Sequence, residues 1–257
     1  EVKSKAPLDC GIYAHQVRVD PSNKAVLIPA RGNGPTAARP EDPGSIKIFS
    51  YNKGMLENQQ TVAPERGFGF QVRHLDFHPS GKWTFITLER QNQIHVYERK
   101  PDGTLSTSPV YVKDSITPKE RQAVGTIHFH PNGKFLYVAN RSSGTVEFEG
   151  KRVAAGGENN IAVFSINLES GEPTMIQSVD TRGFQPRCFS LDASGRFLVV
   201  ANQSAMLVRS GNKVAEVPAS LALFRVGADG KLEFVRKYDV ATGPNRPLFW
   251  AGFVAVS

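Results

Sequence analysis

Arginine, glutamate and histidine side chains recur at fixed distances from a turn that the sequence repeats four times. A guanidinium group binds a carboxylate or a phosphate through paired hydrogen bonds. A carboxylate or an imidazole within reach of a substrate can move a proton to or from it. Together these groups predict acid–base chemistry on an anionic small molecule. Five residues before the turns stand His15, Arg73, Gly125 and Arg187, and eleven residues after the turn openers stand Arg31, Glu89, Arg141 and Gln203.

The repeated unit is typical of two strands joined by a tight turn. Its four copies are VRVDPSNKAVLIPAR from residue 17, LDFHPSGKWTFITLE from 75, IHFHPNGKFLYVANR from 127 and FSLDASGRFLVVANQ from 189. The turns open at Asp20, His78, His130 and Asp192, between 52 and 62 residues apart, whereas many propeller blades repeat every ~40–50 residues. Alternating apolar residues, β-branched and aromatic side chains, and Gly, Pro, Asp and Asn at the turns predict strands in every copy.

Each unit is predicted to contain four strands, because two further strand patterns follow each copy. In the second copy the four expected strands cover residues 73–77, 83–89, 92–100 and 104–113. Repeated four-stranded meanders without helices predict an all-β chain that forms a β-propeller of antiparallel blades. We expect one domain over residues 1–257, with four blades and a partial unit at GPNRPLFWAGFVAVS. A β-sandwich is the alternative, but it does not require such similar units.

The rim of the predicted propeller is where the polar positions meet. In an antiparallel blade, the start of the first strand and the end of the second strand lie at the same edge, so we expect all eight positions on one face near the channel. Between them, apolar residues are expected to pack blade against blade. Packing favours similar residues in each blade, whereas a binding site needs different ones. The varied rim therefore favours a site over solvated loop residues. The packing positions are Val17, Leu75, Ile127 and Phe189, and Val19, Phe77, Phe129 and Leu191.

Three copies carry an insert between their second and third strands, and the second copy has only RQN there. The inserts are GNGPTAARPEDPG, SSGTVEFEGKRVAAGGEN and SAMLVRSGNKVAEVP. Loops on one face of a rigid scaffold often carry function, but they also occur as decoration, and the sequence leaves both interpretations open.

The remaining histidines have simpler interpretations. His78 and His130 stand where Asp20 and Asp192 stand in the other copies, so we expect them to support the turns. His128 and His130 share one side of an expected strand, as two metal ligands do, but no further ligands stand at matching spacing. We therefore expect no metal. His74 and His128 are expected to lie one step inside the rim, beside the substrate.

Composition limits the class of function. The 257 residues are 40% hydrophobic and 21% charged, and the net charge of +7 comes from scattered Lys and Arg residues. This pattern argues against a nucleic-acid partner and suits an anionic small molecule. No apolar run is long enough to span a bilayer, so we expect no membrane partner. Cys10 and Cys188 form neither a disulfide framework nor a zinc signature. The start at Glu1 leaves the compartment, cytoplasm or periplasm, open.

The strings VRHLDFHPSGKWTFITLE, IHFHPNGKFLYVANR and QPRCFSLDASGRFLVVANQ resemble the lactonase family of seven-bladed propellers, which includes bacterial propeller-type 6-phosphogluconolactonases and fungal carboxy-cis,cis-muconate cyclases. The resemblance runs from about Gly11 to the C-terminal ATGPNRPLFWAGFVAV, which looks like the family's closing strand. It implies that two to three N-terminal blades are absent from this chain. It also implies that the family's site residues correspond to His15, Arg73, Glu89 and Arg141.

The leading hypothesis is an enzyme that opens or forms a lactone without a metal or an organic cofactor. Arg73 and Arg141 are expected to bind a substrate carboxylate or phosphate, and Arg187, Arg31 and Gln203 to extend that site. Glu89 is expected to act as the general base and His15 as the proton donor, while arginines stabilise the oxyanion. Hydrolysis and cycloisomerisation remain equally open.

Two alternatives stand beside this hypothesis. The first is a non-catalytic propeller whose inserts form a platform for a protein or a ligand. The second is a fragment whose site needs blades that are not in this chain, which leaves room for association with a partner that completes or covers the propeller.

Overall fold

The computed structural model describes residues 2–116, 121–243 and 246–254. The described residues form strands and one short 3₁₀ turn at Pro64–Gly67, and they contain no helix that is long and apolar enough to cross a membrane. The all-β prediction is therefore confirmed.

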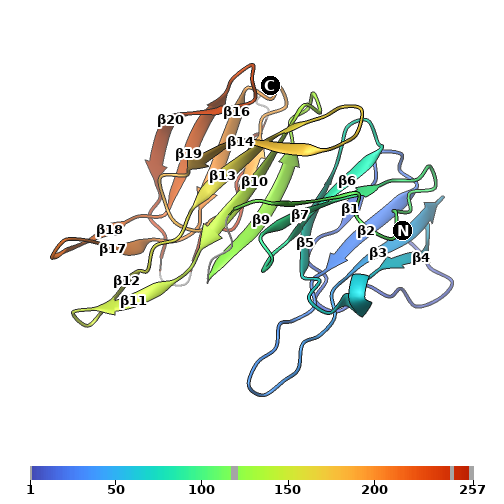
Figure 1. The fold of residues 1–257 in the computed structure, drawn as a ribbon, viewed down its shortest axis with the longest axis horizontal. Coiled ribbons are helices and arrows are strands. Elements are labelled where there is room, and N and C mark those ends of the chain that lie inside the picture. Colours follow the sequence, from blue (N-terminus) through green and yellow to red (C-terminus); the bar gives the residue numbers. More distant parts are fainter. Residues whose placement is uncertain (1, 117–120, 244–245, 255–257) are drawn as a thin grey trace. The chain divides into compact units, whose positions relative to one another are not determined.

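Four antiparallel sheets of four strands each make up the fold, and they follow one another along the chain (Figure 1). The first contains β1 (Arg18–Val19), β2 (Ala25–Ala30), β3 (Ser45–Asn52) and β4 (Met55–Val62), and the second contains β5 (Val72–Phe77), β6 (Trp83–Leu88), β7 (Gln93–Glu98) and β8 (Tyr111–Asp114). The third contains β9 (Gln122–Phe129), β10 (Phe135–Ser142), β13 (Asn160–Ile166) and β14 (Pro173–Asp180), and the fourth contains β15 (Pro186–Leu191), β16 (Phe197–Asn202), β19 (Ser220–Val226) and β20 (Leu232–Asp239). Each sheet is an up-and-down meander, as the repeat predicts for a propeller blade.

The chain divides into two compact units. The first contains the residues up to Lys113 together with Ser170–Glu172, and the second contains Asp114–Glu169 and the residues from Pro173 onward. The first and second sheets belong to the first unit, and the third and fourth sheets to the second unit. That the whole chain forms one domain stays a prediction.

Within each unit, the two sheets pack through apolar side chains that alternate along the strands. In the first unit the core includes Leu27, Ile48 and Leu75, all at most 1% exposed. In the second unit it includes Phe189 and Phe224. Strands place alternate residues on opposite faces, so one face of each sheet supplies this core.

An amide side chain joins the two sheets of each unit in the same way. Gln60 at the end of the first sheet donates to the carbonyl of Leu105 (2.9 Å) and accepts its N–H (2.8 Å). Gln177 makes the same pair of bonds with Leu232 (3.0 and 2.8 Å). In both units, a glutamine side chain thus bonds the backbone N–H and carbonyl of a leucine in the neighbouring sheet. These backbone groups would otherwise be buried without hydrogen bonds.

The repeated turns use their opening residues as predicted. His78 Nδ1 accepts the N–H of Ser80 (3.1 Å), and His130 Nδ1 accepts that of Asn132 (3.1 Å). Asp20 accepts the N–H groups of Ser22, Lys24 and Ala25. The two histidines therefore support turns and lie at the opposite end of their strands from the rim.

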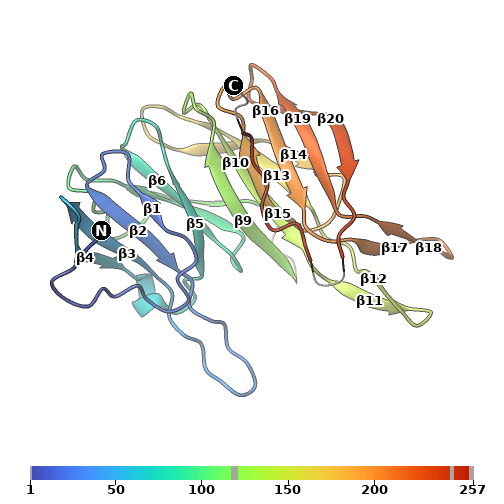
Figure 2. The same ribbon diagram turned by 180° about the vertical axis from the view of Figure 1, so that it is seen from behind.

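Two of the three inserts form β-hairpins. The third sheet carries β11 (Thr145–Phe148) paired with β12 (Lys151–Ala154), and the fourth carries β17 (Met206–Ser210) paired with β18 (Lys213–Val217). Both hairpins project from the same end of their sheets (Figures 1 and 2), and β12 packs against β17. The insert of the first sheet has one bridge, between Thr36 and Arg39.

Three details differ from the sequence-based expectation. Val17 and Val19 are 62% and 52% exposed instead of packed, because within the first unit no further sheet covers that side of β1. β8 begins only at Tyr111. The N–H of Ser106 bonds the carbonyl of Glu98, and the N–H of Val110 bonds that of Val96. Residues 107–109 bulge out between these two bonds, because Pro109 has no N–H to donate.

The expected closing strand is the third difference. Residues 244–245 and 255–256 of this expected strand lie outside the described residues. Residues 246–254 belong to no strand, although Ala251 donates its N–H to Cys188 Sγ (3.2 Å) and Leu248 donates to the carbonyl of Gln203 (2.9 Å). These isolated bonds hold the segment against the fourth sheet without a ladder.

His95 on β7 should make the stability of the fold depend on pH. Burial lowers its pKa from 6.5 to about 4. Between these values the unfolded chain binds a proton that the folded chain does not, so the free energy of unfolding should fall as the pH drops from 6.5 to 4 and level off below 4. His95→Phe should remove this contribution. Urea unfolding of both proteins at pH 7 and pH 4.5 measures it, and equal losses in both proteins would contradict the assignment.

Candidate functional site

The innermost strands carry β-bulges at the rim positions that lie five residues before the turns. A bulge adds one residue to one strand of a pair and changes the direction of its side chains. A bulge can therefore point a side chain in a direction that a regular strand would not allow. The residues at the bulges are Arg73 and His74 on β5, Gly125 and Thr126 on β9, and Arg187 on β15.

In three sheets, a backbone hydrogen bond joins the end of the second strand to the chain just before the first strand. The donor is the residue eleven after the turn opener, and the acceptor is the carbonyl seven before it. The two predicted sets of rim positions therefore lie at the same edge of each of these sheets. The bonds are Arg31 to Tyr13 (3.0 Å), Glu89 to Gln71 (2.8 Å) and Gln203 to Gln185 (3.0 Å).

A carboxylate held between two guanidinium groups is the most polar feature at the rim of the first unit. Glu89 Oε2 accepts a hydrogen bond from Arg31 Nη1 at 2.5 Å, and Oε1 accepts one from Arg73 Nη1. The side chains of Arg73 and Glu89 are only 4% and 8% exposed, and that of Arg31 is 23% exposed. Two adjacent cations favour the ionised form of the carboxylate. The cluster therefore combines a fixed negative charge with donors suited to an anion.

Two histidines lie at the same rim. The rings of His15 and His74 meet edge to face, with centroids 4.8 Å apart and planes at 64°. The backbone N–H of His74 donates to Thr87 Oγ1 (3.2 Å), and the backbone N–H of His15 donates to the carbonyl of Pro29 (2.9 Å). Both side chains are half-buried. Imidazole side chains often act as proton donors and acceptors in enzymes.

Tyr13 connects these two groups. The guanidinium carbon of Arg31 lies 4.5 Å from the centroid of its ring, and the ring of His15 lies 6.3 Å from it. The structure thus brings together all five predicted residues of the first unit, and Tyr13 joins them. The five are His15, Arg31, Arg73, His74 and Glu89.

In the second unit, the guanidinium group of Arg141 and the backbone carbonyl of Arg187 both lie near Gly125. A Cβ atom at Gly125 would lie 4.0 Å from Arg141 Nη1 and 3.8 Å from the carbonyl oxygen of Arg187. Thr126 Oγ1 donates to that same carbonyl (2.9 Å). The guanidinium group of Arg187 lies over the ring of Phe249, at 4.1 Å from the centroid. That these arginines act with the cluster of the first unit stays a prediction.

His128 and Gln203 occupy different surroundings. His128 pairs with Tyr137 and packs edge to face on Phe189, with centroids 5.2 Å apart, and it lies two residues further from the rim than Thr126. Gln203 lines a cavity of about 450 Å³ together with Thr242 and Arg246.

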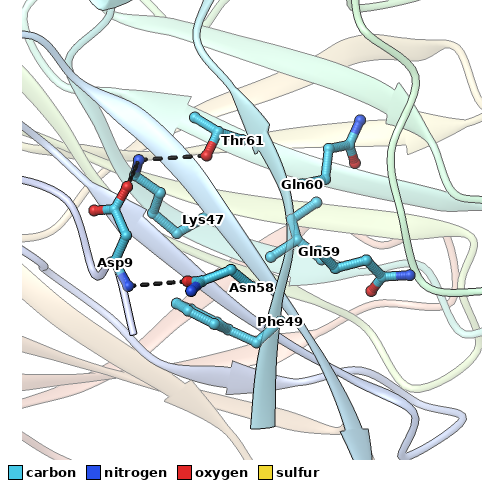
Figure 3. A pocket seen from close by; sticks show the side chains of 8 residues that line it. Asp9, Lys47, Phe49, Asn58, Gln59, Gln60 and Thr61 are labelled. Atoms are coloured by element: carbon cyan, nitrogen blue, oxygen red, sulfur yellow. Dashed lines mark hydrogen bonds and ion pairs between the residues drawn. The ribbon is translucent and has the colours of Figure 1, made fainter. Parts of the chain in front are cut away.

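A separate cavity lies over the first sheet (Figure 3). It measures about 340 Å³ and is lined by residues of β3 and β4 and by Asp9. Lys47 donates to Asp9 (2.5 Å) and to Thr61 (3.3 Å), and the N–H of Asp9 donates to Asn58 (2.9 Å). The hydrogen bond from Lys47 lowers the pKa of the Asp9 carboxyl group. None of the predicted site residues lines this cavity.

Sequence reasoning missed Tyr13 and Thr87. A count extended to seven residues before each turn opener would have reached Tyr13, Gln71, Ala123 and Gln185. The carbonyl groups of three of these four residues accept the hydrogen bonds that join the two strands at the rim. The same count, taken two residues further back, would therefore have found them. Thr87 carried no such signal, because its role depends on the bulge opposite it.

Among the residues that the structure describes, no three His, Cys, Asp or Glu side chains gather closely enough to hold a metal ion.

Comparison with known proteins identifies the family. A profile described as "Lactonase, 7-bladed beta-propeller" matches residues 10–212, which is most of the chain. The chain belongs to this lactonase family. The resemblance expected from the repeats is thereby confirmed, as is the propeller fold class.

Relatives in this lactonase family extend beyond the present chain. A 6-phosphogluconolactonase from Bacillus subtilis is 30% identical over 167 residues, which cover 63% of this chain and 42% of the relative. Another from Enterobacter sp. (strain 638) is 26% identical over 239 residues, which cover 90% of this chain and 59% of the relative. The chain thus spans about half the length of these relatives.

Solved lactonase-like propellers show the same fold. A putative 6-phosphogluconolactonase from Bacteroides uniformis superposes with a TM-score of 0.67 at 21% identity, covering 91% of this chain and 56% of the other. A periplasmic gluconolactonase from Pseudomonas aeruginosa gives 0.61 at 20% identity, covering 91% and 55%.

Proposed function

We propose that this chain carries the active-site cluster of a lactonase that hydrolyses an anionic sugar lactone, with 6-phosphogluconolactone as the first substrate to test. The observation that carries the proposal is the buried Glu89 carboxylate between Arg31 and Arg73 at the blade rim. Relatives of the family named 6-phosphogluconolactonase supply the choice of substrate.

Hydrolysis needs a base for water, a group that stabilises the oxyanion and a donor for the leaving ring oxygen. Glu89 would take the proton of the attacking water. A guanidinium group beside the lactone carbonyl would stabilise the negative charge on its oxygen. His15 would donate a proton to the ring oxygen as the carbon–oxygen bond breaks. Water is thereby added across that bond, and a carboxylic acid and a hydroxyl group result.

The ion pairs of Glu89 suggest how substrate binding and basicity are coupled. While Arg31 and Arg73 hold both carboxylate oxygens, the carboxylate is a weak base, because its negative charge is stabilised. An anionic substrate that binds to the same arginines would neutralise part of their charge. The basicity of Glu89 would then rise only when substrate is present.

The proposal is tested with the chain as it exists, by following acid release from three lactones at constant pH. We expect turnover of 6-phosphoglucono-δ-lactone above the spontaneous rate, and weaker turnover of uncharged glucono-δ-lactone. Turnover of a carboxymuconolactone alone would instead favour an organic-acid lactone as the substrate. Rates equal to spontaneous hydrolysis with all three would refute the proposal for this chain.

A binding platform is the second candidate function, and the paired hairpins favour it. Val153 of β12 is 1% exposed, and the guanidinium group of Arg209 on β17 lies 3.8 Å from the centroid of the Phe148 ring on β11. The two inserts therefore form a single structured arm and not two independent loops.

Removal of this arm separates the two functions. Replacing Thr145–Ala154 and Met206–Val217 by short Gly-Ser turns should leave lactone turnover within about threefold of the parent, because no residue of the Glu89 cluster lies in the arm. The measurement is the rate of lactone turnover by the parent and the variant, assayed at equal protein concentration. A loss of turnover by 100-fold in a variant that still unfolds cooperatively would place the arm in the active site.

A further inference from the structure

Tyr13 is an exposed aromatic residue at the centre of the rim cluster, with 54% of its surface accessible. An aromatic ring offers a flat face on which a guanidinium group can lie. Tyr13 lies against the guanidinium group of Arg31, which in turn binds Glu89. The tyrosine therefore contacts the Glu89 cluster through Arg31, and its ring also lies 6.3 Å from that of His15.

The backbone of Tyr13 is held in a conformation that tyrosine rarely adopts. Its φ angle is 59°, in the left-handed region that favours glycine. Backbone bonds on both sides fix it there: its carbonyl accepts the N–H of Arg31 (3.0 Å), and that of Ile12 accepts the N–H of Gly32 (2.9 Å). A bulky residue kept in a strained conformation beside a polar cluster indicates a functional requirement.

Two contacts position the guanidinium group of Arg31. Glu89 accepts a hydrogen bond from Nη1 at 2.5 Å, and the guanidinium carbon lies over the ring of Tyr13, 4.5 Å from its centroid. Arg31 Nε is buried and has no hydrogen-bond partner among the described residues. Stacking on an aromatic face uses no N–H donor. It therefore orients the guanidinium group and leaves its N–H donors available to bind an anion.

We propose that Tyr13 is a positioning residue, which holds the guanidinium plane of Arg31 by stacking so that its remaining donors face an anionic substrate. This inference rests on the proposed function, because it assumes that Arg31 contacts that substrate. The hydroxyl group of Tyr13 has no part in it, and any flat aromatic ring should serve.

Four substitutions test the proposal by activity. Tyr13→Phe and Tyr13→Trp keep a ring, and kcat/KM should stay within about threefold of the parent. Tyr13→Leu and Tyr13→Gly remove it, and kcat/KM should fall about tenfold, as expected for the loss of one cation–π contact. Glycine also removes the backbone strain, so the Tm of Tyr13→Gly should equal or exceed that of the parent. A loss of activity without a loss of stability separates positioning from a merely structural role.

The matched control is Tyr238→Leu on β20. Tyr238 is similarly exposed (49%) and has Arg236 5.8 Å from its ring, but it lies on the outermost strand. Its replacement should leave kcat/KM unchanged. Equal activity losses for Tyr13→Phe and Tyr13→Leu, or unchanged activity in Tyr13→Leu, would overturn the proposal.

A second readout does not depend on lactonase activity. In the NMR spectrum of protein labelled with ¹⁵N-arginine, the Nε–H signal of Arg31 should be shifted upfield by the ring of Tyr13, remain shifted in Tyr13→Phe and move downfield in Tyr13→Leu. The signal of Arg187, which lies over Phe249, should stay in place. If the parent hydrolyses no lactone, the proposed function fails while this measurement still decides the stacking. An Arg31 signal that does not move in Tyr13→Leu would refute it.

Discussion

Glu89→Gln should reduce lactone turnover by about 10²–10⁴-fold, the usual contribution of a general base. The amide keeps the size of the side chain and one hydrogen-bond acceptor, but it can neither take a proton from water nor balance the charges of Arg31 and Arg73. The measurement is kcat for 6-phosphoglucono-δ-lactone, together with far-UV circular dichroism to show that the sheets persist.

Glu98→Gln is the matched control, because Glu98 is an exposed carboxylate at the end of β7 in the same sheet. Its kcat should not change. If both variants kept the kcat of the parent, another group would have to be the base, and the assignment of Glu89 would be wrong.

Asp20→Ala should cause the largest loss of stability, about 3–5 kcal/mol, because it removes one partner of a buried ion pair. The side chain of Asp20 is fully buried and that of Arg99 is 7% exposed, and the two form an ion pair that Ser22 also joins. The substitution would leave the largely buried guanidinium group of Arg99 without its ion-pair partner, and the charge of Asp102 would then be the remaining negative charge near it. Urea unfolding at pH 7 measures the change.

Asp192→Ala provides the comparison, because Asp192 opens the equivalent turn of the fourth sheet. It accepts the N–H groups of Ser194 and Phe197, but among the described residues no Lys or Arg forms an ion pair with it. The loss there should be about 1–2 kcal/mol, from turn hydrogen bonds alone. Equal losses for the two variants would show that the ion pair of Asp20 adds nothing to stability.

The repeat predicted the blades because every local signal agreed with it. Turn openers, apolar alternation and strand length gave four meanders, and counting from Asp20 and His78 placed Arg31, Glu89 and Arg73 at one edge. The count succeeded because a β-strand repeats every two residues and so fixes which residues share an edge.

The parts that escaped prediction depend on contacts that no local pattern records. Tyr13 adopts a left-handed backbone conformation, and the N–H of Arg31, the residue that follows β2, binds its carbonyl. The inserts after Ser142 and Gln203 carry Gly and polar residues typical of loops, yet they fold as hairpins because they pack against each other. Val17 has the pattern of a core residue, but within its unit it has no sheet to pack against.

A crystal structure of this chain with 6-phosphogluconate, the product of the proposed reaction, tests the central claim most directly. We predict that the carboxylate or phosphate of the ligand lies within hydrogen-bonding distance of Arg31 or Arg73, with Glu89 facing its C1 atom. Binding only in the cavity beside Gln203 and Arg246, or in the cavity beside Asp9 and Lys47, would contradict the account.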